Sequence, residues 1–143
     1  MKEHYKIFIR TSILLLGVLA EGCSKTVSTE PEPSTMNKAV TFTMVQEQVF
    51  NKSCAFSGCH AGLQPQAGMN LSDGNAYSNL VNVISKRNPN YKRVDPGNSS
   101  NSYIIKMLRN TGENTWQMPP SGKLSEDIIG LVESWINDGA KNN

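Results

Sequence analysis

The chain has 143 residues, and its 14 basic and 12 acidic side chains give a formal net charge of +2 at pH 7. Because no long segment carries an excess of lysine and arginine, the sequence lacks the electrostatic footprint of a nucleic-acid-binding protein, and no nucleic-acid partner is expected. Paired acid–base carboxylates, a nucleophile with its base and a phosphate-binding glycine loop are also missing from the sequence, so no hydrolytic or nucleotide-dependent chemistry is predicted.

The first 22 residues have the features of a bacterial export signal. Three basic residues precede an apolar run at 13–20, namely Lys2, Lys6 and Arg10. The run is roughly ten residues long, about half of what a helix needs to cross the hydrocarbon layer, so a cleaved signal is favoured over a permanent membrane span. We therefore expect residues 1–22 to be removed during export.

Cleavage after Gly22 would leave Cys23 as the first residue of the mature chain. This arrangement resembles bacterial lipoprotein signals, which implies that Cys23 is acylated and anchors the protein to a membrane. By resemblance to the Gram-negative sorting pattern, Ser24 slightly favours the outer membrane. Residues 23–39 are rich in Ser, Thr, Glu and Pro, a composition that buries too little apolar surface to fold, and they are predicted to form a flexible tether.

The remaining residues, 40–143, are enough for one domain with a single core, located in the periplasm or at the cell surface. Thr43 and Gln46 form a capping box in front of a first amphipathic helix, expected over residues 44–52. This helix leads directly into a cluster of cysteines.

Two further helices are predicted in the middle of the domain. Asp73 is expected to cap a helix that extends to about Ser85, and either Ser99 or Ser100 is expected to cap the next one. The apolar stripes of these two helices are Ala76, Tyr77, Leu80 and Val81, and then Tyr103, Ile104, Met107 and Leu108.

The clearest helix is the last one. Ser125 is its predicted N-cap, acidic Glu126 and Asp127 lie at its positive end, and Gly139 follows its end. Its apolar stripe consists of Ile128, Leu131, Val132, Trp135 and Ile136. With four short helices and no strand pattern, the predicted fold class is all-α.

The stretch Cys54-Ala55-Phe56-Ser57-Gly58-Cys59-His60 holds two of the three cysteines and one of the two histidines of the chain. Two thiols that add to the vinyl groups of a haem, followed by an imidazole that binds the iron, account for these residue types and their order. Covalent haem attachment usually has two residues between the cysteines, whereas four separate them here. The motif therefore indicates one covalently bound haem c through a longer variant of the attachment sequence.

Few residues can supply the sixth ligand of such an iron. His4 is removed with the export signal, so a thioether is the expected ligand. Met118 is favoured because the two prolines at 119–120 fix the backbone of its loop. Met69 also lies in a loop and remains the competing candidate, while Met107 lies in a helical pattern and is assigned to the core.

A basic loop at 85–93 carries Lys86, Arg87, Lys92 and Arg93. It is either a solvated loop, or a docking patch for an acidic redox partner or a clamp on haem propionates. Trp116 could donate its indole N–H to a propionate, although core packing explains a tryptophan equally well.

Over about residues 40–140, the sequence resembles the class I monohaem cytochrome c family. The segments that carry the resemblance are Cys54…Cys59-His60, Val94-Asp95-Pro96-Gly97, Met118-Pro119-Pro120 and Trp135-Ile136.

The resemblance implies a class I cytochrome c-like domain of about four short helices around one haem. It implies thioether bonds at Cys54 and Cys59, His60 as the proximal ligand and Met118 as the distal one. The first and last helices would pack against each other at one edge of the haem.

The expected function is electron transfer by a lipid-anchored cytochrome c, with redox proteins of the periplasm or membrane as partners and no enzymatic activity. One alternative is a haem enzyme or sensor with an open sixth site that reacts with peroxide or binds small gases. Another is a structural lipoprotein with a Cys54–Cys59 disulfide and no haem. A zinc site lacks a fourth ligand, because the domain has no further cysteine or histidine.

Overall fold

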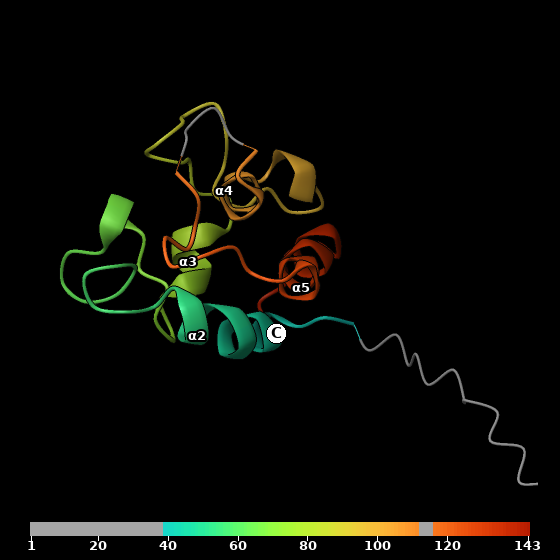
Figure 1. Ribbon diagram of the computed structural model, residues 1–143. Helices are drawn as coiled ribbons and strands as arrows, with labels where there is room; N and C mark the ends of the chain where they lie inside the picture. The colour runs from blue at the N-terminus through green and yellow to red at the C-terminus, as the bar shows by residue number, and fades with distance from the viewer. Residues whose placement is uncertain (1–38, 112–115) are drawn as a thin grey trace, which may run out of the picture. The chain divides into compact units, whose positions relative to one another are not determined.

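The described part of the chain, residues 39–111 and 116–143 of a computed structural model, consists of helices joined by long loops and has no β-strand (Figure 1). All of these residues belong to one contact unit, Met36–Asn143. The predicted all-α class is confirmed for this part. The export signal, the acylation site Cys23 and the tether up to residue 38 lie outside the described residues. Within those that are described, no helix is long and apolar enough to cross a membrane.

The first helical segment is continuous, and it consists of α1 (Phe42–Val45), the π-helical turn η1 (Gln46–Phe50) and α2 (Asn51–Ser53). The predicted helix is therefore present, but its predicted capping box is wrong. The N-cap is Thr41, whose hydroxyl accepts a hydrogen bond from the amide of Met44 at 3.2 Å.

Thr43 does not cap this helix because it lies inside the first turn. Its amide and its hydroxyl both donate to the backbone carbonyl oxygen of Asn143, at 2.9 and 3.0 Å. The side-chain oxygen of Asn143 also accepts from the amide of Phe42 at 2.9 Å. The last described residue thus lies at the start of α1, as Figure 1 shows.

Helix α3 (Ala76–Leu80) is shorter than predicted. Its predicted cap is also wrong, because the carboxylate of Asp73 accepts hydrogen bonds from the side-chain amide Nδ2 of Asn51 instead. The helix ends before Val81, which adopts extended backbone and forms an isolated bridge with Val94. A pairing between distant segments therefore overrides the local helical pattern.

The third predicted helix is divided into η3 (Ser99–Asn101) and α4 (Tyr103–Arg109). The predicted serine caps are wrong, because the side chain of Asn98 caps η3 by accepting from the amide of Asn101. Ser102 precedes α4, but its hydroxyl donates to the carbonyl of Asn98 and accepts from the amide of Asp95.

The last helix, α5 (Glu126–Asn137), confirms the prediction at both ends. The hydroxyl of Ser125 accepts from the amide of Ile128 at 3.4 Å. Gly139 follows the helix with φ of +95°, a conformation that favours glycine. The buried face is rotated slightly from the predicted stripe, since Ile129 is buried and Leu131 is only half-buried.

Helix α5 packs against both α1 and α4 (Figure 1). The ring of Phe42 in α1 lies 5.3 Å from that of Trp135 and 5.4 Å from that of Tyr77 in α3, measured between centroids. Trp135 is almost fully buried, and its indole N–H donates to the carbonyl of Lys141 at 2.8 Å. The first and last helices therefore pack against each other, as expected, and the cysteine cluster follows directly from this core.

Candidate functional site

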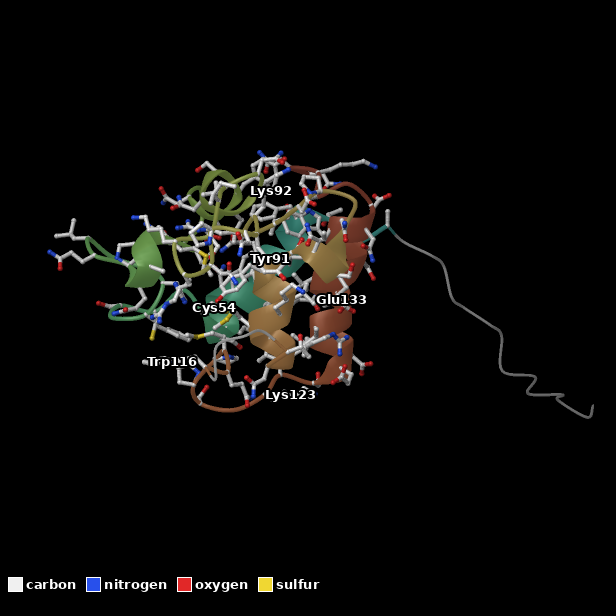
Figure 2. All side chains as sticks on the ribbon, turned by 90° about the horizontal axis from the view of Figure 1, so that it is seen from above. Cys54, Tyr91, Lys92, Trp116, Lys123 and Glu133 are labelled. Atoms are coloured by element: carbon white, nitrogen blue, oxygen red, sulfur yellow. The ribbon has the colours of Figure 1, made fainter. Side chains whose placement is uncertain are left out.

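The five residues that the sequence analysis assigned to cofactor binding line one cavity of about 390 Å³. They are Cys54, Cys59, His60, Trp116 and Met118. The cavity lies between the cysteine cluster, the loop around η2 (Gln66–Gly68), helix α4 and the loop that contains Trp116. Figure 2 shows Cys54 and Trp116 on the same side of the domain. The volume of the cavity falls within the roughly 300–1,000 Å³ that is usual for ligand and cofactor sites.

The four residues between the cysteines form a turn that projects from the domain. The amide of Cys59 donates to the carbonyl of Phe56 at 3.0 Å, and Gly58 has a φ of +81°. The amide of His60 then donates to the carbonyl of Cys54 at 3.2 Å. Because this hydrogen bond closes the turn at its base, Cys54 and His60 lie side by side despite the four residues between the cysteines. The ring of Phe56, in the turn, is 48% exposed.

The thiols of Cys54 and Cys59 are both free. Burial, together with the nearby Cys59, raises the pKa of the Cys54 thiol to about 11. Cys54 is therefore a neutral thiol at neutral pH, unlike the thiolate of an activated cysteine nucleophile. Among the described residues, no three His, Cys, Asp or Glu side chains are grouped in a way that could hold a metal ion.

The imidazole of His60 is half-buried, and its Nδ1 atom lies 3.3 Å from the carbonyl oxygen of Met69. A carbonyl only accepts, so this hydrogen bond places the proton on Nδ1. Burial lowers the pKa of His60, although the carbonyls of Met69 and Gln66 act in the opposite direction. The neutral ring thus keeps the lone pair of Nε2, the arrangement that a metal-ligating histidine requires.

Three thioether side chains line the cavity: Met69, Met107 and Met118. The assignment of Met107 to the core is therefore wrong, because α4 turns its half-buried side chain toward the cavity. The amide of Met118 donates to the carbonyl of Met107 at 3.2 Å, which ties the proline-containing loop to α4.

Three cations also line the cavity, and none of the described lining residues is a carboxylate. Arg93 is only 5% exposed, so the interpretation of residues 85–93 as a fully solvated loop is wrong for this side chain. Lys86 and Arg87 are exposed, and the guanidinium of Arg87 lies 5.0 Å from the ring centre of Trp116. Lys92 lies away from the cavity (Figure 2) and forms an ion pair with Asp95 at 2.8 Å.

The indole of Trp116 is 57% exposed, so core packing does not explain this residue. In the described part of the chain its ring contact is with Arg87, and the two side chains connect the loops on either side of the cavity.

No family model, curated protein or solved structure matches the chain. The donor set of the cavity combines two free thiols, a neutral imidazole, three thioethers and three cations on otherwise largely apolar walls.

Proposed function

We propose that the domain binds one haem c covalently and acts as an electron-transfer protein. The observation that carries this proposal is the convergence of Cys54, Cys59, His60 and Met118 on one cavity. When bound, a haem supplies one-electron chemistry at its iron, and the protein sets its potential and its exposure.

The residues of the cavity fit the chemical parts of a haem. Leu71, Ile104 and Leu108 supply apolar surface for a flat macrocycle. Lys86 and Arg87 have no carboxylate partner among the described residues and could pair with the two propionates. Cys54 and Cys59 line the cavity together with His60, and the backbone amide of His60 donates to the carbonyl of Cys54, which suits attachment of the haem edge next to the proximal ligand.

His60 fits the role of proximal ligand because its Nδ1 atom already donates to a carbonyl. This hydrogen bond orients the ring and increases the basicity of Nε2, the atom that would bind iron. The same contact argues against Met69 as the sixth ligand, because the main chain of Met69 lies on the Nδ1 side of the ring.

Met118 is the better candidate for the sixth ligand. Among the described residues, no hydrogen bond joins its segment to His60, and the segment is held to α4 instead. A thioether opposite an imidazole stabilises reduced iron and raises the potential, which suits an electron carrier. We propose no enzymatic role, and a haem enzyme or sensor would require this ligand to be absent or labile.

We also propose that the protein is exported, that Cys23 is acylated, and that its partners are redox proteins of the periplasm or membrane. Incorporation of radiolabelled palmitate tests the anchor. Wild-type chain should carry the label, and Cys23→Ser should not. A labelled Cys23→Ser variant would overturn this assignment of the lipid site.

The haem is tested by expressing the full chain in bacteria that contain a cytochrome c maturation system. The pyridine haemochrome spectrum of the purified protein should be that of a haem with both vinyl groups saturated. Cys54→Ser and Cys59→Ser should each shift the spectrum to that of a haem with one remaining vinyl group. Colourless wild-type protein would overturn the proposal.

A further inference from the structure

We propose that Arg93 is a positioning residue for His60, which it holds in the correct orientation through the loop at η2. This inference rests on the proposed function only in so far as His60 is to bind iron. The contacts that lead from Arg93 through the η2 loop to His60 are all made by groups of the protein itself.

The guanidinium of Arg93 is buried and acts as a clamp on backbone carbonyls. Nη2 donates to the carbonyl of Ala67 at 2.9 Å, and Nη1 donates to the carbonyl of Asn79 at 2.8 Å. Both nitrogens also lie 3.4 Å from the carbonyl of Gly68. One side chain therefore connects the η2 loop to the end of α3.

Two of the clamped carbonyls, those of Ala67 and Gly68, directly precede the carbonyl that contacts His60. Ala67 and Gly68 are followed by Met69, whose carbonyl accepts from Nδ1. Ala67 has a φ of +54°, which is unfavourable for a residue with a side chain, and Gly68 has a φ of +60°. A loop with two successive left-handed residues needs external contacts to persist, and Arg93 supplies them.

The main chain of Arg93 is itself fixed. Its amide donates to the carbonyl of Val83 at 2.7 Å, and its carbonyl accepts from the amide of Ile104 in α4 at 3.1 Å. The guanidinium thus extends from a backbone that is anchored on two sides.

Arg93 differs in this respect from the other cations of the cavity. Its hydrogen bonds go to protein carbonyls, whereas Arg87 is exposed and stacks on Trp116. Lysine has a single ammonium group and cannot reproduce the planar fork that reaches several carbonyls. A positioning role therefore predicts that Arg93→Lys recovers only part of the wild-type behaviour.

The test is the hydrogen exchange rate of the His60 Nδ1–H, followed by NMR in the full chain. The Trp135 indole N–H serves as an internal control, because it donates to Lys141 in the core. In Arg93→Met we expect His60 exchange to accelerate at least tenfold while Trp135 exchange stays within twofold of wild type. In Arg93→Lys the acceleration should be smaller, and in Lys123→Met, which removes an exposed cation outside the cavity, neither rate should change.

A merely structural role predicts a different result. If Arg93→Met accelerates exchange at His60 and Trp135 by the same factor, or leaves His60 unchanged, the inference is overturned. If Arg93→Met does not fold, Arg93→Lys decides, because it keeps the charge and must still accelerate His60 selectively. Exchange at Nδ1 is read in folded protein with or without haem, so a failure to bind haem contradicts the proposed function separately.

Discussion

The backbone amide of Met118 donates to the carbonyl oxygen of Met107 at 3.2 Å, and the side chains of both residues line the same cavity. This hydrogen bond fixes the loop that carries Met118 against α4, on a segment separate from the one that orients His60. The relationship favours Met118 over Met69 as the proposed ligand of the iron.

Replacing Met118 by leucine keeps the volume but removes the sulfur. We expect Met118→Leu to abolish the far-red sulfur-to-iron charge-transfer band of the ferric protein. Met69→Leu should retain the band, as should the matched control Met44→Leu, which lies outside the cavity. Loss of the band in Met69→Leu or Met107→Leu, with retention in Met118→Leu, would show that another thioether is the ligand. A wild-type protein without the band would favour a haem enzyme or sensor.

The two tryptophans should differ sharply in their contribution to stability. Trp135 is 1% exposed and packs on Phe42, so Trp135→Ala should lower the free energy of unfolding by about 3–5 kcal/mol. Trp116 is 57% exposed, and Trp116→Ala should change that free energy by less than about 1 kcal/mol. Urea denaturation followed by circular dichroism measures both. Equal effects would contradict the description of the core.

Asp95 should stabilise the domain only while it is ionised. Hydrogen bonds from Lys92 and Asn101 hold the pKa of its carboxyl below the usual value. Because the pKa is lower in the folded state, the stabilisation is complete above the unfolded-state pKa of about 4. It is lost as the pH falls from there through the lower pKa of the folded state.

The measurement is the urea midpoint of Asp95→Asn and wild type between pH 7 and pH 3. Asp95→Asn should be less stable at pH 7, and the difference should shrink as the pH falls from 4 toward 3. The control is Glu47→Gln, an exposed carboxylate with no ion pair among the described residues, which should match wild type throughout. A difference that persists unchanged at pH 3 would show that the carboxylate charge is not the cause.

Arg109 should stabilise the packing of α4 against α5 through its ion pairs with two glutamates of α5. Its guanidinium donates to both carboxylate oxygens of Glu133, at 2.7 and 2.9 Å, and to Glu126 at 2.6 Å. Arg109→Met should lower the urea midpoint more than Lys141→Met, because Lys141 makes a single 3.2 Å contact with Asp138. The Arg109 effect should shrink in 1 M salt, where the screening length is about 3 Å. A larger effect for Lys141→Met would contradict this network.

The sequence predicted best those features whose causes are local. The last helix could be located because Ser125 and Gly139 act through their own neighbouring backbone. The cysteines and His60 could be grouped because they lie within seven residues of one another. The features that depend on distant partners were missed, since Val81 leaves the helical conformation by pairing with Val94.

The same limit explains the errors around the cavity. Arg93 belongs to a polar loop in the sequence, and only the folded chain brings it to the carbonyls of Ala67 and Asn79. Thr43 has the spacing of a cap, but the chain enters the helix two residues earlier, at Thr41.

The central claim is that Cys54 and Cys59 hold one haem. The most direct measurement is tandem mass spectrometry of the tryptic peptide of residues 53–86, prepared from protein made with a cytochrome c maturation system. We predict a peptide that carries the mass of one haem, with both thiols resistant to alkylation. An unmodified peptide with two alkylated cysteines, or with a Cys54–Cys59 disulfide, would contradict the proposal.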